Sequence, residues 1–410
     1  MKFEDFSSTT VPEERRVEGF NIFLAWMGFI LVVASMSFGG GLAGQMQADQ
    51  LVKSILIGNT FLALCGAVAG YIGSASALSF GSLASKVFGR GGWRLAILYI
   101  PLTLIGWYAI ESSIFGNFMA DTFGLSDFAR RAIMVGAAIL FSVSAYVGVR
   151  FIGRVSYVLI PAVLLISLFA LSRLGDGSQL SFGFSDTQLS QSAGTAIVMS
   201  TWIFSALLVV PDLTRFVRTP WVGAAIGAAG VFIGNSVALG IGALAAAYTK
   251  QSDPALILVG LGYTPLAVVL TFASIWSTND NNMYSSSLNV ARSLGQPRQR
   301  VVLILALLGA VIAAFNPANL QVMFGFLIFM GASAPPLGAV VLGSYIYRAV
   351  SGREPAGTIA PWIGWAGGTA LAYLFPGAAA IPIAMGGGFL IWLAIETIET
   401  RISKPVREAT

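Results

Sequence analysis

Charge, histidine and cysteine are scarce in this chain. Its 410 residues include 23 Lys and Arg, 18 Asp and Glu, no His and a single Cys. Charged residues make up 10% of the chain, against about 25% in a typical soluble protein. Hydrophobic residues make up 56%, and the mean hydropathy is +0.80. So little charge cannot give a soluble fold of this size a polar shell, and we predict a polytopic membrane protein.

The missing residue types also exclude several kinds of chemistry. Without His there is no His-based metal site, general base or proton relay. The single Cys65 excludes an intramolecular disulfide, and its apolar setting indicates a packing residue. The formal charge of +5 does not indicate nucleic-acid binding, because membrane proteins carry excess Lys and Arg in cytoplasmic loops.

Long apolar runs fill most of the chain. A spanning helix needs ~20 mostly apolar residues. This rule gives twelve candidate spans, over residues 20–44, 51–74, 93–119, 129–149, 155–173, 192–210, 221–249, 264–291, 300–316, 320–347, 358–376 and 378–397. The predicted fold class is therefore all-α. Residues 1–19 and 398–410 read as charged tails, and the polar segment 175–191 reads as an exposed loop that divides the chain.

The distribution of Lys and Arg predicts the orientation. The two termini and every second loop between them hold 18 of the basic residues, and the remaining loops hold 5. Because basic residues gather in cytoplasmic loops, this bias places both termini in the cytoplasm. It also favours an even number of spans, with eleven or thirteen as the alternative.

Two similar motifs indicate an internal repeat. The sequence IGNT at 57–60, in the second candidate span, resembles IGNS at 233–236, in the seventh. Five spans separate them, an odd number, so the two copies have opposite orientations, as in the inverted repeats of secondary transporters. The repeats would cover residues 20–173 and 192–347. A coincidence between two small-residue packing motifs is the alternative.

Interrupted helices mark binding sites in transporters. Three glycines at 39–41 in the first span each cost about 1 kcal/mol relative to Ala in a helix. In the sixth span, the sequence STWIFSA at 200–206 precedes Pro211. The two spans are equivalent under the repeat, and we predict a break in each, with tight packing as the alternative for the glycines. Pro335 and Pro336 predict a kink in the tenth span.

The eighth span carries the densest polar group, STNDNN at 277–282. Polar groups within a membrane normally face the bundle interior or a cavity. Ser274, Thr278 and Asn281 share one helix face, and Ser277 lies beside them. Their oxygens suit a hard monovalent cation, with unwound carbonyls of the first span completing the shell. The alternative is a helix cap that emerges into water.

The third span places Leu104, Trp107 and Glu111 on one face. A charged Glu at mid-membrane is costly, so Glu111 should line water, pair with another group or be protonated. We interpret it as a site or gate residue, with a structural Glu as the alternative. Trp107 offers a π face for a flat ligand, with a packing Trp as the alternative. Asp280 also falls inside a span and points to the same region.

These segments together resemble the nucleobase–cation symporter family, in particular its bacterial cytosine permease branch. The resemblance rests on ASM at 34–36 with the glycines that follow, LIGN at 56–59, GYIG at 70–73, GW at 106–107, Asp212 with RF at 215–216, GNS at 234–236, IWSTNDN at 275–281 and PP at 335–336. It implies a leucine-transporter-type fold of five plus five inverted helices, with two additional helices over 358–397. It also implies sodium-driven, alternating-access import at the plasma membrane, which in a bacterium is the inner membrane.

The resemblance assigns roles to particular residues. For the coupling ion, sodium, it implies carbonyl and hydroxyl ligands from Val32, Ser35, Ser274, Ser277 and Thr278. For a small planar, nitrogen-rich substrate it implies a stack between Trp107 and an aromatic side chain of the sixth span, with polar groups nearby. The substrate residues on this prediction are Leu104, Trp107, Glu111, Trp202, Phe204, Ser205, Asn279 and Asn281. We expect a monomer with no organic cofactor and no catalytic residue.

Three positions depart from the permease pattern. The permeases carry a Gln that reads the base where this chain has Leu104, and a small residue where it has Glu111. The stacking position of the sixth span falls on Ile203, between two aromatic residues. A carboxylate suits an amidine-like or cationic, NH-rich ligand. The predicted substrate is therefore a nitrogen-rich heterocycle or a related amine, with cytosine itself in question.

Other functions stay open. Proton coupling through Glu111 is the nearest alternative to sodium. A channel needs a continuous pore, which the inverted repeat disfavours. An enzyme is disfavoured because no His/Cys cluster, carboxylate pair or nucleophile–base pair is evident. An amino-acid transporter of the same fold would need backbone donors for a carboxylate at a broken helix.

Overall fold

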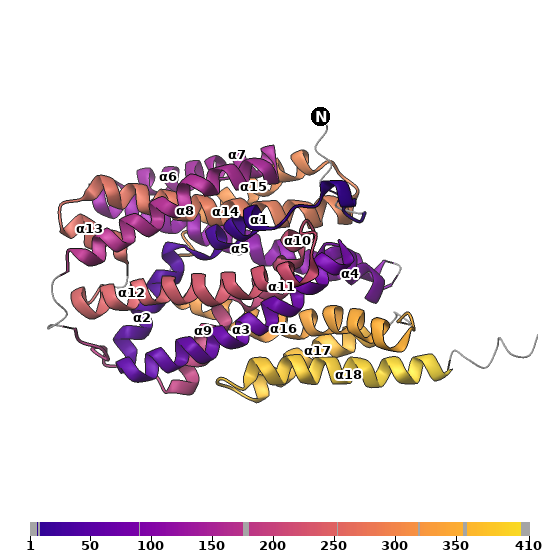
Figure 1. Cartoon of the computed structure of the whole chain (residues 1–410). Coiled ribbons are helices and arrows are strands. Elements are labelled where there is room, and N and C mark those ends of the chain that lie inside the picture. Colours follow the sequence, from indigo (N-terminus) through magenta and orange to yellow (C-terminus); the bar gives the residue numbers. More distant parts are fainter. Residues whose placement is uncertain are drawn as a thin grey trace, which may run out of the picture.

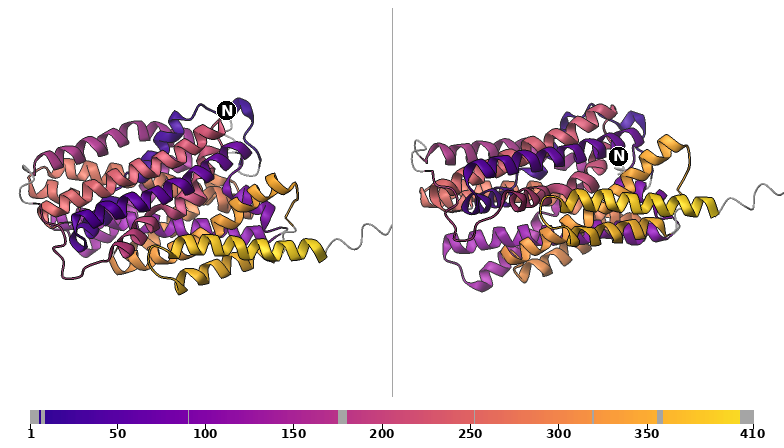
Figure 2. Two further views of the ribbon diagram at one scale, coloured as in Figure 1. Left: turned by 60° about the horizontal axis from the view of Figure 1, so that its bottom comes forward. Right: turned by 90° about the horizontal axis from the view of Figure 1, so that it is seen from below.

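The structure is a computed structural model that describes residues 6, 9–89, 91–174, 180–251, 253–318, 320–355 and 359–402. This described part is almost wholly helical, with an isolated parallel bridge between Val17 and Val217. The long helices run side by side along a common axis in Figure 1 and in both views of Figure 2. The bundle confirms the predicted all-α, polytopic membrane fold.

Most successive helices are joined by short connections, and a longer one lies between α8 and α9. In chain order the elements are η1 (Glu13–Arg15), α1 (Phe20–Ile30), α2 (Val33–Gln45), α3 (Ala48–Ser76), α4 (Phe80–Val87), α5 (Gly92–Phe123), α6 (Asp127–Leu140), α7 (Val143–Val147), α8 (Val149–Ser172), α9 (Gln191–Phe204), η2 (Ser205–Val209), α10 (Val210–Thr214), α11 (Pro220–Ala229), η3 (Gly230–Asn235), α12 (Ser236–Thr249), α13 (Pro254–Gly260), α14 (Thr264–Leu294), α15 (Arg298–Ala314), α16 (Leu320–Ser351), α17 (Ala360–Leu374) and α18 (Ala380–Ile402). Each predicted range overlaps one of these helices or a run of successive ones. The count of twelve spans and the inverted repeat remain predictions.

Helix length and apolarity identify the spans. Among the described residues, seven helices are long and apolar enough to cross a bilayer, and two bent pairs pass the same test together. One pair is α14 and α15, which meet at 119°. At 1.5 Å per residue they are about 46 and 26 Å long, so each is near or above the length needed to cross a ~30 Å hydrocarbon core. The bend between them therefore reverses the chain.

The first span breaks at Leu31 and Val32, and not at its glycines as predicted. The helices on either side, α1 and α2, meet at 50°. α2 then continues through the glycines because Gly39 packs against the backbone of α12. A Cβ at Gly39 would lie 2.1 Å from the carbonyl oxygen of Leu239. Tight packing, the alternative considered for the glycines, is the correct reading at this position.

The sixth, eighth and tenth spans continue without a gap. In the sixth, α9 passes into the π-helical turn η2 at Ser205 and then into α10, which contains Pro211. In the eighth, residues 277–282 are buried in the middle of α14, which excludes the helix cap considered as the alternative. In the tenth, α16 is one helix across Pro335 and Pro336.

The described part of the N-terminal segment is docked on the bundle and is not a free tail. Val11 is buried, and its N–H donates to the carbonyl of Ala77 at the end of α3. The guanidinium of Arg16 donates to the carbonyl of Val217 with Nε 3.1 Å away. The segment therefore ties α3 to the turn that follows α10. Residues 1–5, 7 and 8 lie outside the described part, as do 403–410 of the predicted C-terminal tail.

The loop between the fifth and sixth spans is also docked. Its first residues, 175–179, lie outside the described part. The N–H of Ser181 donates to the carbonyl of Ala247 (3.1 Å), and that of Gly183 donates to the carbonyl of Ala43 (2.9 Å). These bonds satisfy carbonyls at the ends of α12 and α2, so the loop covers that end of the bundle.

Candidate functional site

A cavity lies where the broken first span meets α5, α9, α14 and α16. The space between the protein atoms that line it, including the part open to solvent, is about 420 Å³. Its lining residues are Phe29, Val32, Ala34, Ser35, Phe38, Leu104, Trp107, Glu111, Thr201, Trp202, Phe204, Ser205, Thr278, Asn282 and Met330. Most of the wall is aromatic or aliphatic, so the few polar groups on it fix what can bind.

Trp107 forms the α5 side of the cavity. Its ring packs edge-on against Phe38, with centroids 6.3 Å apart, and against Phe326, with centroids 5.7 Å apart. The indole N–H points to the sulfur of Met330, 3.1 Å away. The neighbours therefore hold the ring in contacts of the kind that aromatic pairs favour.

Trp202 and Phe204 approach the cavity from the sixth span. The indole Nε1 of Trp202 donates to the hydroxyl of Ser35 at 3.1 Å, and its ring meets Phe29 edge-on with centroids 5.1 Å apart. Phe204 leans on Tyr99, with centroids 5.8 Å apart. The intervening Ile203 is buried outside the lining. Ile203, at the expected stacking position, does not line the cavity, whereas its neighbours Trp202 and Phe204 do.

Glu111 brings a carboxylate to the cavity from α5. The residue is 3% exposed, and the described part of the chain offers it no ion pair. Asn282 donates to Oε2 over a long 3.5 Å, whereas Oε1 has no hydrogen-bond partner among the described residues. A buried carboxylate normally gathers several donors or a cation. Much of the accepting capacity of Glu111 is therefore directed at the cavity.

Asn282, which is not among the residues predicted from the sequence, occupies the place expected for Asn281. The Asn281 amide donates to the carbonyl of Ser277 in its own helix (3.0 Å) and does not line the cavity. Asn282 lies one turn after Thr278 on the lining face and also donates to Oδ1 of Asn279 (3.2 Å). Asn279 lies behind this face. The signal in the sequence for Asn282 is its place in the same polar run as Asn279 and Asn281.

Asn279 links α14 to α5. Its Nδ2 donates to the hydroxyl of Ser112 (3.3 Å) and to the carbonyl of Tyr108 (3.4 Å). Because its Oδ1 accepts from Asn282, the chain of bonds continues to Glu111. Asn279 therefore supports the polar wall from behind and does not line the cavity itself.

Hydroxyls of α14 meet backbone carbonyls of α1 beside the cavity. Ser277 donates to the carbonyl of Gly28 and Thr278 to that of Phe29, at 2.9 and 3.1 Å. Both hydroxyls also lie close to the carbonyl of Ser274, at 2.9 and 3.2 Å. Five oxygens thus converge in one buried niche.

The helix break explains why these carbonyls are available. The last four carbonyls of a helix lack intrahelical donors, and α1 ends at Ile30. The chain turns at Val32, whose own N–H bonds back to the Ile30 carbonyl, so the carbonyls of Gly28 and Phe29 are left to α14. Val32 and Ser35, the expected carbonyl ligands, both line the cavity; the Ser35 hydroxyl is used by Trp202.

Asp280 faces away from the cavity. Its Oδ1 accepts from the hydroxyl of Ser144 in α7, and Trp276 donates to the same hydroxyl at 2.8 Å. The expectation that this acidic residue marks the site is therefore wrong. It belongs to the packing of α14 against α7.

Comparisons with known proteins place this geometry in a family. Residues 10–354 match the model of the family described as permease for cytosine/purines, uracil, thiamine, allantoin. The chain is 26% identical to the cytosine permease of Escherichia coli (strain K12) over 407 residues, covering 97% of this chain and 95% of that protein.

Solved structures show the same fold. Mhp1, a nucleobase-cation-symport-1 family transporter in a closed conformation with bromovinylhydantoin bound, matches with a TM-score of 0.80 at 15% identity over 97% of this chain and 96% of that one. A Na+-coupled sialic acid symporter in a substrate-bound outward-open state matches with a TM-score of 0.68 at 12% identity over 96% and 91%. Since the family model spans most of the sequence, the chain belongs to the family of permeases for cytosine/purines, uracil, thiamine and allantoin.

Proposed function

We propose that this protein is a sodium-coupled importer of a nucleobase or a related nitrogen-rich heterocycle, and that it works by alternating access. The observation that carries the proposal is one juxtaposition: a cavity with aromatic walls lies directly beside a helix break filled with oxygens. A flat ring fits the first feature and a small, hard cation the second. Interrupted helices at a central site are typical of secondary transporters.

The proposed sodium site is the niche between α1 and α14. The hydroxyls of Ser277 and Thr278, which donate to carbonyls here, would rotate and turn their oxygens to the ion. The carbonyls of Gly28, Phe29 and Ser274 would complete the shell. The backbone carbonyls of Val32 and Ser35, on the α2 side of the break, are further proposed ligands of the ion. The ion would tie the broken helix to α14 and stabilise the state that binds substrate; by linkage, substrate would strengthen sodium binding equally.

The proposed substrate lies against Trp107, with Trp202 or Phe204 on its other face. Ser205 is a polar contact on the sixth-span side, Leu104 covers the ring, and Asn279 acts through Asn282. Asn281, which bonds within its own helix, is dropped from this set. Relatives named cytosine permease and nucleobase-cation-symport transporter support a ligand of this chemical class.

Thr278→Ala tests the sodium site. Losing one oxygen ligand of an ion is comparable with losing a hydrogen bond to a charge, roughly 1.5–3 kcal/mol, or about tenfold or more in affinity. We expect the sodium concentration that gives half-maximal substrate binding to rise by that factor, while binding at saturating sodium is largely kept. Sodium titration of substrate binding to the purified protein measures this.

Thr278→Ser is the matched control, because it keeps the hydroxyl and removes only a methyl group. It should leave the sodium midpoint near that of the wild type. An unchanged midpoint in Thr278→Ala would remove Thr278 from the ion site.

Glu111 supports a second candidate, proton coupling. A buried carboxyl that lines the cavity, and that has no ion pair with any described residue, is suited to binding and releasing a proton. Uptake into proteoliposomes without sodium, driven by a pH gradient and lost in Glu111→Gln, would favour this mechanism. A strict sodium requirement at every pH would exclude it.

A further inference from the structure

We propose that Glu111 selects substrates that present two adjacent N–H donors: a ring N–H next to an exocyclic amino group, as in guanine and isocytosine, or an amidinium group. This inference rests on the proposed function and specifies the chemical class of the ligand. Two observations support it. The Glu111 carboxylate lies in the cavity one turn from Trp107, and few hydrogen-bond donors of the described residues reach it.

Glu111 stands at the edge of a ring stacked on Trp107. The two residues are four apart on α5, one above the other on the same helix face, and both line the cavity. Leu104, three residues before Trp107, lines the cavity on the opposite side and offers no hydrogen bond. Around a ring held by Trp107, the α5 face therefore supplies one strongly polar group, and that group is a carboxylate.

The carboxylate is held in place but not satisfied. Asn282 reaches Oε2 over 3.5 Å, and Asn282 itself bonds to Asn279, which is anchored to Ser112 across the helix interface at 3.3 Å. This chain of bonds connects the carboxylate to α14 and back to Ser112. Oε1 remains without a partner among the described residues, and Oε2 has a single long bond.

Two ligand N–H donors or an amidinium group would favour the ionised form of Glu111. In that form the carboxylate only accepts hydrogen bonds, and its two oxygens match two parallel N–H groups. Guanine and isocytosine, in the tautomer with a ring N–H beside the amino group, offer this pair. Cytosine places a ring nitrogen lone pair beside its amino group, and uracil places a carbonyl on each side of its N–H. With both of these, an acceptor on the ring faces an oxygen of Glu111 and repels it.

Glu111→Gln changes the hydrogen-bond donors and acceptors that the site offers to a ligand. An amide offers one donor and one acceptor, which matches the amino group and ring nitrogen of cytosine. We therefore expect an inversion: wild type binds isocytosine at least tenfold more tightly than cytosine, and the variant binds cytosine at least as tightly as isocytosine. Binding of both, with uracil and guanine added, is measured by competition at saturating sodium.

Asp280→Asn is the matched control. It also neutralises a fully buried carboxyl, and it lies on the face of α14 that packs against Ser144 and away from the cavity. The order of ligand affinities should be that of the wild type. An inversion in this variant as well would show that loss of buried charge, and not the contact with the ligand, sets the preference, and would overturn the inference.

Failure of the inference and failure of the proposed function look different. If wild type binds these rings but prefers cytosine to isocytosine, or if Glu111→Gln keeps the wild-type ratio, the inference is wrong and the proposed function stands. If wild type binds none of the four rings or simple amidinium compounds, the proposed function itself is wrong and the inference falls with it. The ranking of ligands by the wild type needs no variant. It therefore tests the inference even if Glu111→Gln folds poorly.

Discussion

The side chain of Trp107 is positioned by its neighbours. Its N–H is directed at Met330, and its ring packs against Phe38 and Phe326 in T-shaped contacts. A ring that its neighbours already hold loses little side-chain entropy when a ligand binds, which is the advantage of preorganised binding sites. If the proposed substrate stacks on this ring, we therefore expect little of the binding free energy to be lost to ordering the side chain.

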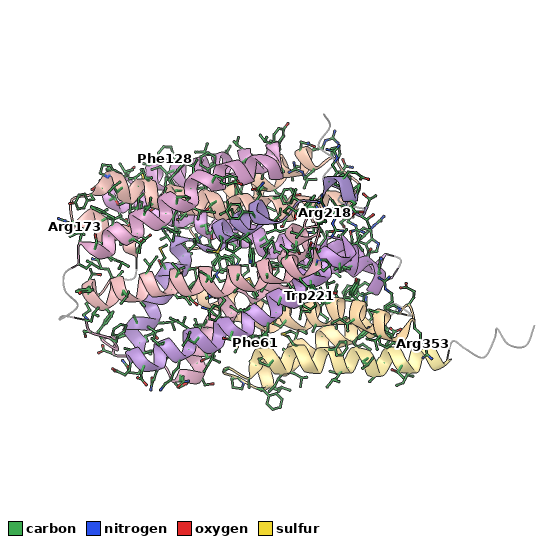
Figure 3. The ribbon with its side chains drawn as sticks, in the orientation of Figure 1. Phe61, Phe128, Arg173, Arg218, Trp221 and Arg353 are labelled. Atoms are coloured by element: carbon green, nitrogen blue, oxygen red, sulfur yellow. The ribbon has the colours of Figure 1, made fainter. Side chains whose placement is uncertain are left out.

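Trp107→Ala should weaken substrate binding by about 5- to 150-fold, because stacking of a base on an aromatic side chain is worth roughly 1–3 kcal/mol. Trp107→Phe should keep part of the affinity. Trp221→Ala is the control, since this indole is 74% exposed on the flank of the bundle, where Figure 3 labels it. Equilibrium binding of the best ligand measures all three, and equal losses in Trp107→Ala and Trp221→Ala would contradict a stacking role.

Helix periodicity identified the faces of the site but not the last residue on them. Leu104, Trp107 and Glu111 were placed together by their spacing alone, and all three line the cavity. Asn281 and Asn282 fit the face of Ser274 almost equally, as seventh and eighth residues along a helix with 3.6 residues per turn. The choice between them depends on where α5 packs, and this is not encoded locally in α14.

At the scale of the elements, too, some features follow from the local sequence and others depend on packing against a neighbouring helix. The long helices follow from apolar runs, and their bounds agree with the predicted spans within a few residues. α4 and α13 were missed because helices of eight and seven residues are too short for a search for spans. The break in the first span was placed at the glycines because a glycine weakens a helix and also permits close packing, and only the neighbouring helix decides between these roles.

Gly39 and Gly41, two residues apart in α2, allow that distinction to be measured. A Cβ at Gly39 meets the backbone of Leu239 in α12, whereas one at Gly41 meets nothing within 4 Å. Gly39→Ala should cost about 1–3 kcal/mol through overpacking, because backbone cannot move aside cheaply. Gly41→Ala should be neutral or stabilise the helix by up to about 1 kcal/mol. Thermal unfolding in detergent compares the two, and equal midpoints would show that α2 and α12 do not pack this closely in the membrane protein.

At the scale of the whole molecule, basic residues and the hydrogen bonds of α4 lie at the same end of the bundle, the end that carries the N-terminal segment. Figure 3 shows Arg218 and Arg353 at the end of the bundle that carries the N-terminal segment, and Arg173 at the other. The distribution of basic residues predicts that the first end faces the cytoplasm. There Arg292 of α14 donates to two hydroxyls of α4, and the N–H of Phe80 donates to Asp212 (2.8 Å). These bonds hold α4 across the end of the bundle and close it.

The polar face of α14 connects the cavity to this closed end. Beyond Asn282 it continues through Ser285 and Asn289, which are 1% and 2% exposed, and within the described part of the chain the Ser285 hydroxyl has no hydrogen-bond partner. A polar stripe that leads from a binding site to a closed end is the expected lining of a path that opens in another state. If the transporter alternates its access, water must reach Ser285 from the cytoplasm in the inward-open state.

Cysteine labelling tests this path. In a Cys65→Ala background, Ser285→Cys introduces one thiol with almost no change in shape and without breaking a recorded hydrogen bond. We expect it to react with a membrane-impermeant maleimide from the cytoplasmic side of inside-out vesicles, and sodium with substrate to slow the reaction several-fold by favouring closed or outward-open states. Leu303→Cys, on a 55% exposed position of α15, is the control for a lipid-facing thiol and should stay unlabelled. Labelling of Ser285→Cys at the same rate with and without ligands would show that this face of α14 does not open and close with transport.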